Sequence, residues 1–141
     1  MIAPQQSSRR GSLTMELLLV FPIVVALLLG MIEFSMILFS RQQLLAASRE
    51  GARVAALGGD KQDVKNAVQR YLGQGRLATT EVRLTDAAGA AIASGGAVPP
   101  GEPVEVWLRL PTNYAVPDLL KFVGFSIKKD ELVARTVMRR E

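Results

Sequence analysis

The chain has 141 residues, a formal net charge of +4, and neither cysteine nor histidine. Without cysteine no disulfide can stabilise the fold, and without histidine the usual proton shuttle and the commonest metal ligand are missing. The basic residues flank a long apolar run and few aromatic residues alternate with them, which argues against a nucleic-acid interface. We therefore expect no catalytic site, no metal or other cofactor, and neither nucleic acid nor a small-molecule substrate as partner.

A short polar leader precedes the apolar run. Residues 1–11 have no hydrophobic pattern, and Arg9 and Arg10 favour a cytoplasmic location for them by the positive-inside rule. Residues 17–39 carry a single charge and would form a helix about 34 Å long, enough to cross a hydrocarbon core of about 30 Å. The chain is predicted to cross the membrane once, with the C-terminal part outside the cytoplasm.

The apolar run belongs to a longer predicted helix that covers residues 12–57. Only Pro22 interrupts it, and because proline lacks the N–H that a helix needs, a bend is expected there. After the apolar run, small and charged residues continue the helical pattern as far as Gly58 and Gly59, which are predicted to end it.

A carboxylate lies at each end of the apolar run, and such groups are costly in a membrane unless something pairs with them. Glu16 either pairs with an ammonium group of a neighbouring subunit or lies in the headgroups near the helix N-terminus, where the helix dipole favours it. Glu33 either pairs with a basic residue on another subunit or on an assembly platform, or reaches the outer headgroups. The sequence alone leaves both choices open.

The remaining residues, 60–141, are predicted to form a small α+β head outside the cytoplasm. Asp60 is suited to cap a helix that would close near Gly73 and Gly75. The apolar stripe of this helix is Val64, Ala67, Val68, Tyr71 and Leu72. Alternating patterns predict strands at 81–85, 103–110 and 132–138, and a short helix is expected at 117–123. The expected fold is thus one long N-terminal transmembrane helix followed by one helix and an antiparallel sheet of about three strands.

The head contains one combination of residues that resembles a catalytic pair. Ser126 lies close in sequence to Lys128 and Lys129, and a serine–lysine dyad has this composition. The three residues also suit an ordinary polar turn, and that interpretation is preferred. We predict that the protein is not an enzyme.

Gly11 and Ser12 form a candidate processing site. Glycine permits an extended backbone that a protease can reach. Cleavage after Gly11 would leave Ser12 as a new amino terminus, and its ammonium could neutralise Glu16 of a neighbouring subunit. In the alternative interpretation, Gly11 merely begins the helix.

These features carry a resemblance to a known family. Gly11-Ser-Leu-Thr-Met-Glu16 before an apolar helix resembles the cleavage site of type IV pilins and pseudopilins. A longer set of motifs resembles the TadE family of minor pseudopilins of the tight-adherence (Flp/Tad) pilus. The set comprises Arg10-Gly11, Glu16, Pro22, Gly30-Met-Ile-Glu33-Phe34, Arg49-Glu-Gly-Ala-Arg53 and the final Met138-Arg-Arg-Glu141. One departure is Leu17, where the family usually has an aromatic residue.

The resemblance implies a minor pseudopilin in the bacterial inner membrane, with the pilus as a second location. Its partners would be the bilayer, other pilins and pseudopilins, the pilus assembly platform, and the prepilin peptidase that cuts after Gly11. Glu16, Pro22, Gly30 and Glu33 would serve helix packing and assembly. The alternative is an uncleaved single-pass anchor subunit of an envelope secretion or signalling complex.

Overall fold

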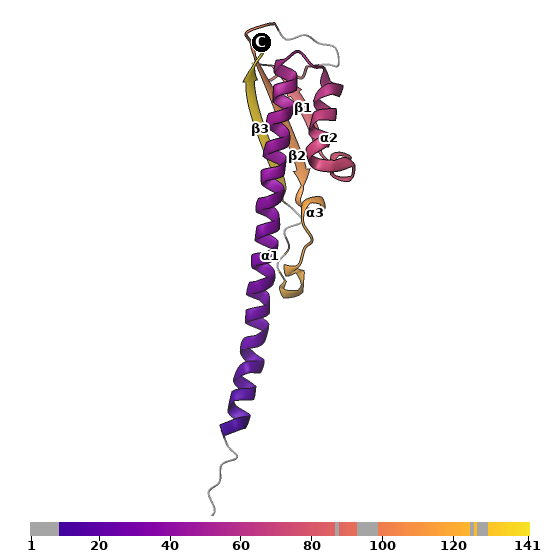
Figure 1. Cartoon of the computed structure of the whole chain (residues 1–141). Helices are drawn as coiled ribbons and strands as arrows, with labels where there is room; N and C mark the ends of the chain where they lie inside the picture. The colour runs from indigo at the N-terminus through magenta and orange to yellow at the C-terminus, as the bar shows by residue number, and fades with distance from the viewer. Residues whose placement is uncertain (1–8, 87, 93–98, 125, 127–129) are drawn as a thin grey trace, which may run out of the picture.

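The computed structural model describes residues 9–86, 88–92, 99–124, 126 and 130–141 and has the expected α+β fold (Figure 1). A long helix is followed by a second helix, a three-stranded antiparallel sheet and two short helical segments. In chain order the elements are α1 (Arg9–Ala56), α2 (Lys61–Leu77), β1 (Glu81–Thr85), β2 (Pro103–Pro111), α3 (Thr112–Ala115), the 3₁₀ helix η1 (Leu120–Val123) and β3 (Glu131–Arg139).

Helix α1 runs without a break through Pro22 and ends close to the expected point. It begins at Arg9, three residues before the predicted start, since arginine favours helix and nothing in front of Ser12 stops it. At the other end, the Gly58 N–H bonds to the Ala55 carbonyl and the Gly59 N–H to the Val54 carbonyl, at 3.0 Å each. With a φ of 88° at Gly58, this is a Schellman cap, which satisfies two carbonyls that the helix leaves open.

Helix α2 has the predicted cap and most of the predicted stripe. The Asp60 carboxylate accepts from the Asp63 N–H at 2.8 Å, and Asp63 accepts from the Asp60 N–H at 3.1 Å. Val64, Ala67, Val68 and Leu72 are buried as expected, whereas Tyr71 is 50% exposed, as suits a ring with a polar tip. The helix breaks at Gly73, close to its predicted end, and the φ of this glycine is 73°. A further helical turn then follows and reaches Leu77.

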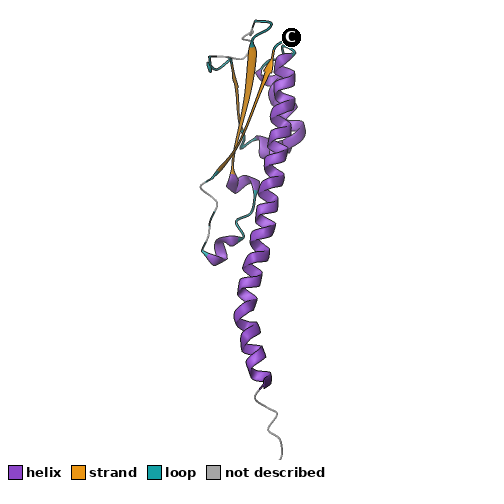
Figure 2. Ribbon diagram, turned by 90° about the vertical axis from the view of Figure 1, so that its left-hand side faces the viewer, coloured by secondary structure: helices purple, strands orange, loops and turns teal. Residues whose placement is uncertain are grey.

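The sheet has the order β1-β2-β3, with both neighbouring pairs antiparallel. The central strand β2 pairs with the last strand along its whole length, with Val104 opposite Met138. One face of the sheet is apolar and lies along the C-terminal half of α1 (Figure 2). Its buried side chains are Leu84, Val104, Val106, Leu108, Leu110 and Ala134.

The C-terminal half of α1 therefore forms part of the core of the head. Its buried residues Leu44, Ala47, Ala52 and Ala55 pack in one cluster with α2 and the sheet. The C-terminus is also tied to this helix, because the Glu141 N–H donates to the Ala56 carbonyl at 3.1 Å.

The segment between β2 and β3 differs from the prediction. The expected helix at 117–123 is only a 3₁₀ turn at Leu120–Val123, closed by Gly124 with a φ of 88°. A short helix α3, which the pattern did not predict, precedes it. Elements of four residues are too short to show a hydrophobic period in the sequence. The 3₁₀ geometry is common in such short pieces.

Candidate assembly helix

The N-terminal half of α1 projects away from the head with its apolar side chains uncovered (Figure 1). The five consecutive residues 17–21 are each 42% to 71% exposed. At about 100° per residue they cover the whole circumference of the helix. The most apolar window of α1 has a mean hydropathy of 2.7, and only 6% of it is buried. A helix that is apolar all round needs a membrane or a packed partner.

Glu16 lies on this bare half, two turns from the start of α1. Its side chain is exposed, and it has no ion-pair partner among the residues that the structure describes. Gly11 and Ser12 lie in the first helical turn, where the leading N–H groups have no helical acceptor and the backbone opens easily. Pro22 is likewise exposed.

Gly30 and Glu33, by contrast, are covered by the head, because the segment that contains Leu120 packs against them. Glu33 is only 2% exposed, and its Oε2 accepts a hydrogen bond from the Leu120 backbone N–H at 3.0 Å. A Cβ added at Gly30 would lie 3.8 Å from Leu120 Cδ2, so the leucine side chain rests on this glycine. An apolar hollow borders the contact. It is lined by Ile23, Ala26, Leu27, Gly30, Met31, Phe34 and Leu120.

Neither of the two interpretations of Glu33 included this contact. The sequence pattern predicted a short helix near Pro117 but not that it would return to the membrane helix. Ser40 supports the same arrangement further along α1, since its hydroxyl donates to the Ala115 carbonyl at 3.3 Å. A polar residue within an apolar run was the only signal available for such an intramolecular partner.

The basic cluster near the end of α1 forms a local ion pair. Arg53 donates to Glu50 at 2.6 Å and 2.9 Å, the i,i+3 pairing expected for a solvated helix face. This hydrogen-bonded guanidinium lowers the pKa of Glu50, with smaller contributions from the Arg53 and Arg70 charges. Because the folded pKa is depressed, the stabilisation from this pair is present above the unfolded pKa and is lost as pH falls through the folded value.

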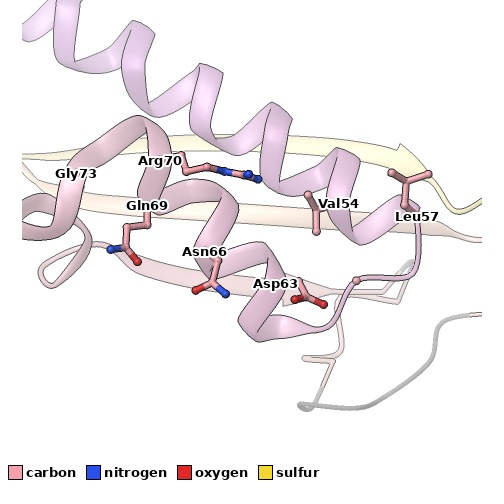
Figure 3. A pocket seen from close by; sticks show the side chains of 8 residues that line it. Val54, Leu57, Asp63, Asn66, Gln69, Arg70 and Gly73 are labelled. Carbon is pink, nitrogen blue, oxygen red and sulfur yellow. The ribbon is translucent and has the colours of Figure 1, made fainter.

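A shallow groove lies between the end of α1 and α2 (Figure 3). Its lining includes Val54 and Leu57 of α1 and Asn66, Gln69 and Arg70 of α2. The described residues include no cluster of acidic side chains able to hold a metal ion. Ser126 donates to Asp118 at 2.8 Å, while Lys128 and Lys129, the other members of the suggested dyad, lie outside the described residues.

Most of the long helix is similar to a known protein family. A family model described as TadE-like protein matches residues 11–53. The chain carries a TadE-like domain. The matched TadE-like segment begins at Gly11, contains the whole bare half of α1, and extends into the part that packs in the head. This family belongs to the Tad pilus and is of a structural type rather than enzymatic. One apolar N-terminal helix in such a family indicates a single-pass membrane protein of a pilus system.

No curated protein and no solved structure matched the chain. The TadE-like match ends at residue 53, so the fold of the head rests on the structure described above.

The TadE-like segment also contains a glycine whose role the structure explains. Gly51, the middle residue of Arg49-Glu-Gly-Ala-Arg53, faces α2 and the sheet together. A Cβ added there would lie 3.1 Å from Val68 Cγ2, 3.3 Å from Val64 Cγ1 and 3.5 Å from Val106 Cγ1. The absence of a side chain lets three elements meet at one point.

Proposed function

We propose that this chain is a minor pseudopilin that contributes to assembly of a Tad-type adhesive pilus. The bare apolar half of α1, within a TadE-like segment that begins at Gly11, is the observation that carries the proposal. The other half of the same helix is built into the head. A subunit of this shape presents one helical rod to neighbouring helices, while the core formed with α2 and the sheet stays outside the bilayer.

Packing of this rod depends on side-chain fit and on polar pairing. Lipid tails are as apolar as leucine, so association of helices in a bilayer gains little from hydrophobic burial alone. The exposed Glu16 carboxylate offers a polar contact at one end of the rod. After removal of residues 1–11 by a prepilin peptidase, the Ser12 ammonium of an adjacent subunit is its natural partner, because opposite charges attract strongly where water is scarce.

The proposed topology puts the leader in the cytoplasm and residues 60–141 outside the inner membrane. Arg9 and Arg10 at the start of α1 support this orientation through the positive-inside rule. The head has no large apolar run that would itself require lipid, and its core is complete with α1, α2 and the sheet.

A photocrosslinking experiment in the native membrane tests the function. A photoreactive phenylalanine in place of Leu19, which is 70% exposed, should yield adducts with another pilin or with a second copy of this chain. The same group in place of the exposed Lys65 on α2 is the control for random encounters and should give no such adduct. Mass spectrometry identifies the partner.

Adducts that contain only a non-pilin envelope protein would instead support an uncleaved anchor subunit, and pilus assembly would be the wrong function. Adduct formation from position 65 alone would also contradict the proposed role of the bare helix.

A further inference from the structure

A short segment of the head lies against the middle of α1, and we call it the flap and define it as residues 117–124. It includes η1 and lies beside the middle of α1, nearer to the N-terminus of that helix than the sheet does (Figures 1 and 2). The hydrogen bond from the Leu120 N–H to Glu33 fixes its height along the helix.

The position of Glu33 in the bilayer follows from helix geometry. If the hydrocarbon begins at Leu17, directly after Glu16, then about 30 Å of hydrocarbon corresponds to about 20 residues and ends near residue 36. Glu33 then lies about 5 Å inside the outer edge. The exposed Phe34, Leu38 and Phe39 support this depth, since they continue the apolar surface beyond Glu33.

The surface of the flap suits this boundary. Phe122 is 93% exposed, the most exposed of the large apolar residues described, although it lies next to other apolar residues of the same short turn. Lys121 beside it is also exposed and is long enough to place its ammonium among the headgroups. A phenylalanine beside a lysine suits a segment that lies in the membrane interface, with the ring towards the acyl chains and the ammonium among the headgroups.

Backbone polar groups that enter lipid must be hydrogen-bonded within the protein, and three N–H groups of the flap are. The Leu119 N–H donates to the Pro117 carbonyl at 3.1 Å, and the Gly124 N–H donates to the Lys121 carbonyl at 3.1 Å. The Leu120 N–H, which would otherwise be open at the start of the turn, is taken by Glu33. The Glu33 carboxylate is in turn covered by protein, with only 2% of the residue exposed.

From these observations we infer that the flap is a lipid-contacting element that enters the outer interface of the bilayer and is held there by Glu33. It would set the depth of α1 and keep the head against the membrane. The inference rests on the bilayer location of α1 and not on pilus assembly, so either can fail without the other.

Nitroxide depth measurements on the full chain in phosphatidylcholine–phosphatidylglycerol vesicles test the inference. The chain has no cysteine, so each introduced cysteine is the only labelling site. The label is placed on Phe122→Cys, with Leu27→Cys as the reference for lipid and Lys65→Cys for water. Asn113→Cys is the matched control, because α3 ends at Ala115 beside Ser40, about 10 Å further out than Glu33.

The label at position 122 should be more accessible to oxygen than to a water-soluble nickel chelate, as at position 27. Labels at positions 113 and 65 should be more accessible to the nickel chelate. Glu33→Gln, which keeps an acceptor for Leu120, should preserve the depth of the label at 122. Glu33→Ala should move it towards water. A water-like signal at 122 in the unmodified background, or an unchanged depth in Glu33→Ala, would overturn the inference.

Discussion

Replacement of Gly51 by leucine should unfold the head at temperatures where the unaltered protein is folded. The Cβ alone would meet two valine methyl carbons of α2 at 3.1 Å and 3.3 Å and one of β2 at 3.5 Å. Overpacking of this kind usually costs about 1–3 kcal/mol and sometimes more. Because α1, α2 and the sheet all meet here, we expect a loss at the upper end, about 3 kcal/mol.

The chain offers a matched control in Gly75→Leu. A Cβ added at Gly75 has no atom within 4 Å, so the same substitution meets open space there. Thermal unfolding of the full chain in detergent, followed by the near-ultraviolet signal of Trp107, measures both variants. Similar transition temperatures for Gly51→Leu and the unaltered protein would show that the three elements do not pack as described.

Removal of the Glu16 carboxylate should uncouple the chain from its neighbours while leaving the head intact. The Glu16 side chain is exposed and far from the core, so Glu16→Gln has no packing reason to affect folding. Polar contacts between helices in lipid are worth about 1–2 kcal/mol, which corresponds to a change of roughly tenfold in association. The yield of the adduct from position 19 should fall by about that factor.

The exposed head carboxylate of Glu81 serves as the control for loss of one negative charge. It pairs with Arg83 on the surface of β1, and Glu81→Gln should leave the adduct yield unchanged. An equal yield with Glu16→Gln would mean that Glu16 lies in the headgroups, the simpler of the two interpretations.

Much of the fold could be predicted because the longer elements have a regular hydrophobic period. In the strand at Pro103–Pro111 every second residue from Val104 to Leu110 is apolar and buried, and the stripe from Val64 to Leu72 follows the helical period. The C-terminal end of α1 follows from Gly58 and Gly59, which cap the helix as expected. These signals lie within each element, so they do not depend on what the element packs against.

The flap could not be predicted for the opposite reason. Its contact with Glu33 joins residues 87 positions apart, and a turn of four residues has no period that indicates its partner. Likewise, Gly51 appeared only as part of a motif, and its close approach to Val64 and Val68 required the arrangement of two helices. Both interpretations of Glu16 stay open, since no described residue of the same chain forms an ion pair with it.

The intact mass of the protein extracted from its native membrane tests the central claim most directly, namely that a new amino terminus pairs with Glu16 of a neighbour. The account predicts a mature chain that begins at Ser12, and a Gly11→Val variant that keeps residues 1–11. A chain that still begins at Met1 in cells that contain an active prepilin peptidase would contradict the claim, because no Ser12 ammonium would exist to meet the carboxylate.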